Sequence, residues 1–314
     1  VLVLCLVWMA ISCSQSSEST DQRAEESETS EPAQSAMEAA VTLDRVGTSG
    51  VILAEPGAGR SVGAPRVLWR HPGPGPAVVA PIVADGTVVV GFADYTFRAF
   101  DTESGAESWV LSLATMPTAA AVGSGGLYIA GERSVSQISL EDGTPIWETA
   151  APSAANGGLL ATSAAVYLLQ NDGGIRAISA VTGETIWTVP PPAESPGRVT
   201  GDGIGRPAAL DAVVYSVTTG GELRAHRASD GSLVFRKELD IVPLAGPLVR
   251  RDGIVVTGSD GTIVLIDRTT GQEISRRQVD GVLLTTAVPA GNALLVVDAE
   301  GKIYRADARV SEVR

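Results

Sequence analysis

The sequence contains few cysteine, histidine and aromatic residues. Its 314 residues include two Cys, two His and 4% aromatic residues. Both cysteines, Cys5 and Cys13, lie within the first thirteen residues. The remainder of the chain therefore has no disulfide, no thiolate metal site and no cysteine nucleophile.

Positive charge is also scarce, and its shortage excludes some partners. The chain has 23 Lys and Arg against 36 Asp and Glu, which gives a formal net charge of -13. Nucleic acid and anionic membrane surfaces repel such a chain, so we expect no nucleic-acid partner. The 44% of hydrophobic residues can supply a sizeable core, while 35 Gly and 18 Pro predict frequent turns and exclude a long-helix protein.

The first residues predict export and a lipid anchor. Residues 1–12, VLVLCLVWMAIS, are apolar and uncharged. They are shorter than the roughly 20 residues of a membrane-spanning helix and are typical of a signal peptide. The segment Ala10-Ile11-Ser12-Cys13 resembles a bacterial lipobox, and this resemblance implies that the Cys13 thiol carries diacylglycerol. The alternative is a buried amino-terminal strand with an incidental cysteine.

The following segment has the composition of a tether. Residues 14–40 are rich in Ser, Glu and Gln and contain seven acids against the single base Arg23. Without an apolar period, residues 13–40 are predicted to be a disordered acidic tether that extends by self-repulsion. Residues 41–65 are more apolar and Gly-rich, and are predicted to be a linker or an added edge strand.

A repeat of about forty residues governs the rest of the chain. Four Trp recur with spacings of 40, 38 and 40 residues, and a Gly stands four residues before three of them. Two further units keep this Gly, one before Phe235 and one before Ser275. The residues of this motif are Trp69, Gly105, Trp109, Gly143, Trp147, Gly183, Trp187, Gly231, Phe235 and Gly271.

Each unit also contains three short β-branched runs separated by Asp-Gly-type turns, with the TGxxxW-like segment starting a fourth strand. Four-stranded units that bury both faces by stacking on their neighbours describe a β-propeller. The motif resembles the PQQ-like (quinoprotein-type) propeller repeat, roughly ALDxxTGxxxW. The resemblance implies that each Trp docks between adjacent sheets near the Gly turn, and that residues 66–314 form one propeller.

The repeat count predicts six blades and a particular closure. The last unit offers inner strands near Leu284–Ala287, Leu294–Asp298 and Lys302–Asp307, but no TGxxxW segment afterwards. The segment Arg66–Arg70 carries Trp69 and has no inner strands before it. We therefore expect an all-β, single propeller that is closed by this N-terminal strand, which removes the open sheet edges.

The sequence gives no indication of catalysis. Quinone-dependent dehydrogenases of this superfamily are longer, with eight blades, a Ca²⁺ and an acidic base, so we expect no cofactor. No Gly-x-Ser-x-Gly elbow and no metal-binding His pair occur, so no catalytic or metal site is predicted. His226 occupies the slot that Phe100 and Ile138 hold in other units, which favours a packing role.

Three features remain as candidate contact sites. The interval from Trp187 to Phe235 is 48 residues, and the excess lies in residues 188–206, either a binding loop or a neutral insertion. Basic residues on two outer strands form either a patch for an acidic partner or solvated charge: Arg236, Lys237, Arg276 and Arg277. Acids at the second hairpin turn form either a cation-attracting ring or simple turns: Asp94, Glu132, Asp172, Glu222, Asp260 and Glu300.

These observations favour an extracytoplasmic, membrane-anchored lipoprotein that acts as a non-catalytic protein-interaction scaffold. In its lipobox, tether and repeat type the chain resembles the propeller lipoproteins of outer-membrane β-barrel assembly, which have eight blades. The resemblance implies an envelope protein partner and a role in outer-membrane protein assembly, with the chain a monomer within any complex. The alternative is a propeller that binds or senses a small molecule or a sugar.

Overall fold

The computed structural model describes residues 67–123, 125–155, 158–191, 203–290 and 293–307. All of them belong to the unit formed by residues 41–314. The predicted signal peptide, Cys13, the tether and the linker lie outside the described residues. No helix among the described residues has the length and apolar character needed to cross a membrane.

The described chain is all β, as the repeat predicted. Twenty-three strands form six antiparallel sheets, and within each sheet the strands follow chain order. The first three sheets comprise β1 (Ala77–Ala84), β2 (Thr87–Phe92), β3 (Thr96–Asp101) and β4 (Glu107–Ser112); β5 (Pro117–Gly123), β6 (Gly126–Gly131), β7 (Ser134–Ile138) and β8 (Pro145–Ala150); and β9 (Leu159–Ala161), β10 (Ala165–Leu169), β11 (Ile175–Ser179) and β12 (Thr185–Val189).

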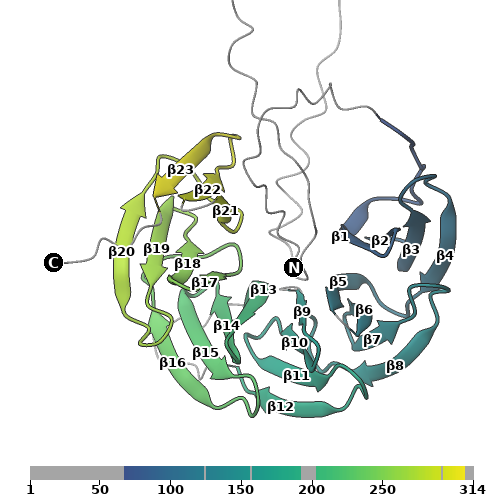
Figure 1. The fold of residues 1–314 in the computed structure, drawn as a ribbon, viewed down its shortest axis with the longest axis horizontal. Coiled ribbons are helices and arrows are strands. Elements are labelled where there is room, and N and C mark those ends of the chain that lie inside the picture. Colours follow the sequence, from purple (N-terminus) through teal and green to yellow (C-terminus); the bar gives the residue numbers. More distant parts are fainter. Residues whose placement is uncertain (1–66, 124, 156–157, 192–202, 291–292, 308–314) are drawn as a thin grey trace, which may run out of the picture. The chain divides into compact units, whose positions relative to one another are not determined.

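The fourth and fifth sheets also have four strands, and the sixth has three. They comprise β13 (Gly203–Leu210), β14 (Val213–Thr218), β15 (Glu222–Arg227) and β16 (Leu233–Glu238); β17 (Leu248–Arg250), β18 (Gly253–Thr257), β19 (Thr262–Ile266) and β20 (Glu273–Gln278); and β21 (Val288–Ala290), β22 (Ala293–Val297) and β23 (Ile303–Asp307). Figure 1 shows the first strand of each sheet innermost and the fourth strand outermost, the arrangement of a β-propeller.

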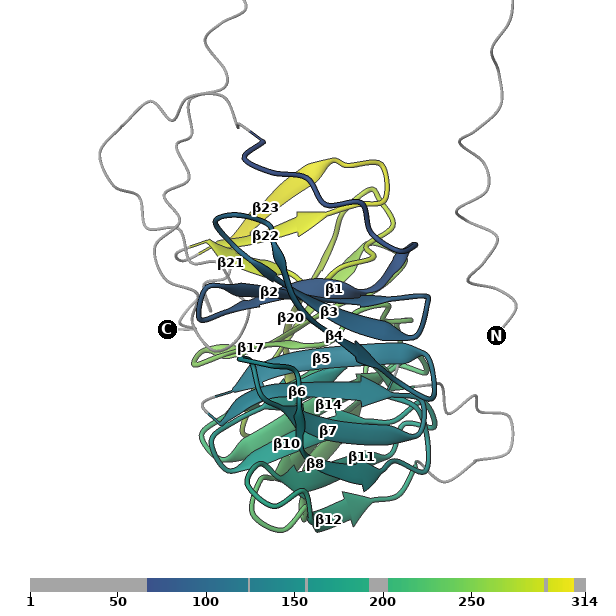
Figure 2. The same ribbon diagram turned by 90° about the vertical axis from the view of Figure 1, so that its right-hand side faces the viewer.

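The hydrophobic core consists of layers between consecutive sheets. Five clusters of buried residues are found among the described residues, and each draws its members from two neighbouring sheets. In the first of these layers Phe97 packs with Leu127 and Ile129, and Figure 2 shows the two sheets stacked face to face. Because most inner strands are covered on both faces, they are apolar almost throughout rather than alternating.

An aromatic ring on the outermost strand of each of the first four sheets contacts the next sheet. The indole of Trp109 donates to Leu140 O at 2.9 Å, and those of Trp147 and Trp187 donate to Ala180 O and Ala228 O. The ring of Trp109 lies so close to Gly143, at φ +74°, that an added Cβ would meet it at 2.7 Å. Glycine is therefore required at this turn for its backbone conformation and for the space that the indole occupies.

Trp69 has the same relation to the first sheet. Its indole donates to Thr102 O at 2.9 Å, and its ring covers Gly105, at φ +71°. The other rings belong to the outermost strand of the preceding sheet, so Trp69 stands where such a strand would lie. Residues 67–70 are not in a strand, however, and the sixth sheet has three strands among the described residues. The predicted closure is therefore not shown and stays a prediction.

The prediction of a strand near Leu284–Ala287 was wrong. The first strand of the sixth sheet is β21, at Val288–Ala290, and only an isolated bridge between Leu283 and Asp298 precedes it. The backbone before β21 interacts with the fifth sheet instead. Thr257 Oγ1 donates to Thr285 O at 3.0 Å, and Thr286 Oγ1 donates to Gly246 O at 3.0 Å. These hydrogen bonds to the fifth unit take the place of the β-ladder that was predicted for Leu284–Ala287.

We predict that residues 66–70 pair with β23 and close the propeller. Trp69→Ala should cost about 3–5 kcal/mol of unfolding free energy in denaturant titrations, as truncation of a large packed ring does. Deletion of residues 41–70 should cost more and should accelerate hydrogen exchange at β23, because that strand would lose its partner. Deletion of residues 14–40 is the control and should leave stability unchanged. Unaltered exchange at β23 after the longer deletion would contradict this closure.

Candidate functional site

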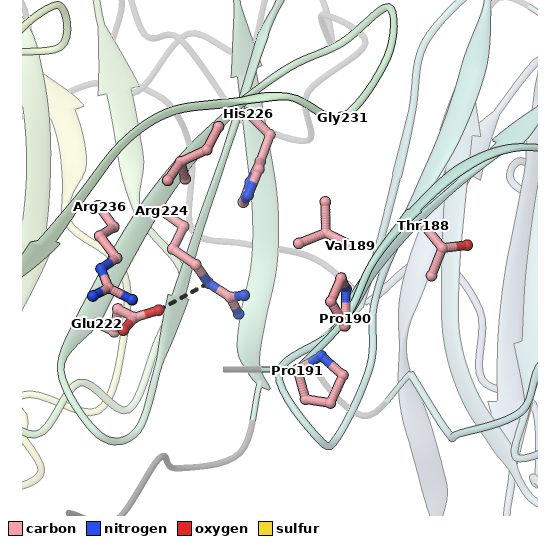
Figure 3. A pocket seen from close by; sticks show the side chains of 10 residues that line it. Thr188, Val189, Pro190, Pro191, Glu222, Arg224, His226, Gly231 and Arg236 are labelled. Atoms are coloured by element: carbon pink, nitrogen blue, oxygen red, sulfur yellow. Dashed lines mark ion pairs between the residues drawn. The ribbon is translucent and has the colours of Figure 1, made fainter. Parts of the chain in front are cut away.

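The described residues contain a pocket of about 360 Å³ between the third and fourth sheets. It lies between the end of β12 on one side and strands β15 and β16 on the other, and Figure 3 shows their side chains facing each other across it. The lining residues are Thr188, Val189, Pro190, Pro191, Glu222, Arg224, His226, Gly231, Leu233 and Arg236.

Strand periodicity places three polar side chains on the pocket face of β15. Glu222, Arg224 and His226 occupy alternate positions and therefore point to one side of the sheet. The intervening residues, Leu223 and Ala225, belong to the core layer between the fourth and fifth sheets. The pocket face of β15 is thus polar although its residues are buried, with His226 only 2% exposed.

Arg224 is held by its own sheet and by the preceding one. Its Nε lies 3.3 Å from Glu222 Oε1, with both side chains almost fully buried. Its guanidinium also donates to Gly173 O, in the turn between β10 and β11. Burial lowers the pKa of the Arg224 guanidinium, and the nearby Glu222 carboxylate opposes that effect.

His226 is a buried, neutral imidazole at pH 7. Burial, with a smaller contribution from the charge of Arg224, lowers its pKa from 6.5 to about 4. Its Nδ1 has no hydrogen-bond partner, and neither has Nε of Arg224. The predicted packing role of His226 fits its burial, but the residue also faces the pocket.

Basic groups outnumber acidic groups among the residues that line the pocket. Arg236, on β16, lies directly opposite Arg224 in the strand register, and its side chain is exposed. Two guanidinium groups thus face one carboxylate, that of Glu222, in a chain whose net charge is -13. The guanidinium groups of the lining can bind an anionic group.

The other predicted contact residues have local partners or lie apart. Asp94, Asp172 and Asp260 accept hydrogen bonds from backbone N–H groups two residues on, so they shape their turns. Only Glu222 of that predicted ring lines the pocket, and no group of three or more His, Cys, Asp and Glu that could hold a metal occurs in the described part of the chain. Arg276 is engaged by Glu273 and by Leu239 O, each at 2.8 Å.

The long insertion begins at the pocket. Thr188, Val189, Pro190 and Pro191 form one wall, whereas residues 192–202 lie outside the described residues. The length of this segment predicted a contact site, but Arg224 was not identified from the sequence as a binding residue. The available signal was the alternation Glu-x-Arg-x-His on a third strand, where the fifth unit has Thr262, Val264 and Ile266.

Comparison with known proteins identifies the family. A family model described as outer membrane protein assembly factor BamB matches residues 65–137, 112–240 and 192–314. The chain belongs to the BamB family. BamB-family members that it resembles include those of Yersinia pestis, 25% identical over 253 residues, and Shewanella oneidensis, 26% identical over 259 residues. Each match covers 76% of this chain, but only 53% and 63% of the respective relatives.

Solved structures support the BamB-type fold. BamB from Moraxella catarrhalis is 19% identical and has a TM-score of 0.50, with 76% of this chain and 85% of that chain covered. The computationally designed Ika8 protein is 16% identical and has a TM-score of 0.65, with 74% and 70% covered. At these identities the likeness concerns the fold alone.

The buried imidazole predicts a specific pH dependence of stability. Because the pKa of His226 is about 4 when folded and 6.5 ordinarily, the unfolded chain binds more protons between these values. Stability from this residue is therefore complete above pH 6.5 and is lost as the pH falls towards 4, by about 2 kcal/mol between pH 7 and pH 5. In denaturant titrations His226→Ile, which copies the other units, should lose that much less over this interval. Equal losses in both proteins would contradict the prediction.

Proposed function

We propose that this chain is a non-catalytic protein-interaction scaffold of the bacterial cell envelope that takes part in outer-membrane protein assembly. The match of the BamB family model across residues 65–314 carries this proposal. The relatives from Yersinia pestis and Shewanella oneidensis are both named outer membrane protein assembly factors. The arginines that line the pocket supply groups suited to a binding role.

The cellular location of the protein is part of the proposal. The lipobox-like sequence before Cys13 and the acidic segment after it support an extracytoplasmic lipoprotein on an extended tether. In this arrangement the lipid supplies the membrane attachment and the propeller supplies the surface for an envelope protein. We propose no quinone, metal or nucleic acid as a partner.

A second candidate function is the binding of a small molecule or a sugar. The pocket of about 360 Å³ between the third and fourth sheets favours it, because a scaffold does not require such a cavity. The two functions differ in what the chain retains after purification from membranes: a scaffold keeps a protein, and a sensor keeps a small ligand.

We predict that Cys13 anchors the protein. When the chain is expressed behind a complete export signal, Cys13→Ala should move it from the membrane fraction to the soluble fraction, because the acyl chains are attached to that thiol. Cys5→Ala is the matched control and should stay with the membrane. Retention of the Cys13→Ala protein in the membrane would contradict the anchor.

We also predict a partner from the outer-membrane assembly apparatus. Crosslinking of the tagged, full-length chain in envelopes, followed by mass spectrometry, should enrich β-barrel assembly components over the same protein carrying Trp147→Ala. That variant should lose the indole packing between the second and third sheets and hence the propeller surface. Equal recovery with both proteins, or enrichment of unrelated envelope proteins only, would contradict the assembly role.

A further inference from the structure

The arginine that lines the pocket lacks a partner that its counterparts in other sheets have. The third strands of the first, third and fourth sheets carry Arg at the same position, namely Arg98, Arg176 and Arg224. Arg176 Nε donates to Thr185 Oγ1 at 2.9 Å. Arg98 Nη1 donates to Glu107 Oε2 at 2.9 Å, while Arg98 Nε donates to Thr96 Oγ1 at 3.2 Å. Thr185 and Glu107 each begin the fourth strand of their own sheet.

In the fourth sheet this partner is missing. Strand register places Leu233 opposite His226, as it places Thr185 opposite Ile178 in the third sheet. A leucine therefore stands where the other sheets have a hydroxyl or a carboxylate. Glu222 lies 3.3 Å from Nε of Arg224 but accepts no hydrogen bond from that atom. A buried N–H donor without an acceptor is rare in proteins, so this donor indicates an acceptor from outside the sheet.

Two further groups face the same space. His226 is 2% exposed, and its Nδ1 has no hydrogen-bond partner. Arg236 lies directly opposite Arg224 on the next strand, a pairing of like charges that is unfavourable unless an anion lies nearby. Figure 3 shows Arg224 and His226 directed towards the wall formed by Val189, Pro190 and Pro191.

The donor groups of the pocket point to the ligand class. Two arginines line the pocket with the single carboxylate of Glu222, while the Asp172 carboxylate acts on Arg224 from outside the lining. A guanidinium presents paired N–H donors that match the two oxygens of a carboxylate. The opposite wall, with Val189, Pro190 and Pro191, is suited to the apolar part of a ligand rather than to more charge.

We propose that the pocket between the third and fourth sheets binds the carboxylate of a ligand, with Arg224 and Arg236 contacting its oxygens and Pro190 and Pro191 packing against its apolar portion. The carboxylate belongs either to a peptide segment or to a small organic acid. The site does not depend on the proposed assembly role, because it rests on the pocket residues alone.

Titration followed by histidine-ring NMR tests this site at pH 7. The chain has two histidines, so His226 is assigned by its loss in His226→Ile, and His71, in contact with Phe100, is the internal reference. N-acetylleucine, which has one carboxylate and an apolar side chain, should shift the His226 ring signals saturably and leave those of His71 in place. N-acetylleucinamide, which lacks the carboxylate, and inorganic phosphate at equal ionic strength should bind at least about tenfold more weakly.

Variants on the exposed strand β16 keep the test independent of folding. Arg236→Gln should weaken binding about tenfold, because it removes one of the two cations. Lys237→Gln is the matched control: it loses the same charge from the adjacent residue, which points to the other face of the strand. Leu233→Thr should also weaken binding, because it gives Arg224 Nε the internal acceptor that Thr185 gives Arg176.

The relative affinities distinguish a peptide ligand from a small organic acid and test whether the pocket binds a carboxylate. If an N-acetylated peptide that ends in a free carboxylate binds more tightly than N-acetylleucine, the ligand is a peptide. The reverse order supports a small acid. Absence of a shift at His226, equal affinity for phosphate or for the amide, or equal losses in Arg236→Gln and Lys237→Gln would overturn the carboxylate site.

Discussion

The contact between an aromatic ring and a glycine turn of the next sheet is the interaction on which the described structure depends. The ring of Trp109 occupies the space that a side chain at Gly143 would need, and the indole N–H satisfies a carbonyl of the same turn. Each single sheet has too little buried surface to be stable alone. A contact repeated at about forty residues therefore fixes the spacing of the sheets, and the apolar layers between them follow from it.

The sixth sheet shows what happens where this contact fails. Ser275 replaces the aromatic residue on the outermost strand of the fifth sheet, while an apolar layer that includes Leu265 and Leu294 still joins the two sheets. Tyr304 Oη donates to Asp298 Oδ2 at 2.9 Å and contacts Asp280 O at 2.5 Å. On β23, Ile303 is 70% exposed. At the opposite end of the described chain, Trp69 contacts the first sheet in the same way as the other rings contact theirs, but it belongs to no sheet.

The repeat was predictable from the sequence because its determinants are local. Gly at a positive φ, an aromatic residue four positions later and β-branched runs between Asp-Gly turns all lie within one unit, so a single pass along the chain detects them. The pocket was not predictable in the same way. It depends on the end of β12 meeting β15 and β16, and on the absence of a hydroxyl at Leu233, which becomes visible only once strand register relates this residue to Thr185. The start of β21 was misplaced for a related reason, since contacts with the fifth sheet decide the path of that segment.

The polar face of β15 is not required by the fold. At the same positions of the fifth sheet, Val264 and Ile266 are fully buried in an apolar layer, and the sheet stacks on its neighbour as the fourth does. Replacing such packing with a buried arginine, a carboxylate and an imidazole disfavours folding unless every polar group finds a partner. Arg224 Nε and His226 Nδ1 make no hydrogen bond. The propeller geometry thus accounts for where the pocket lies, whereas the residues that line it are explained by binding rather than by stability.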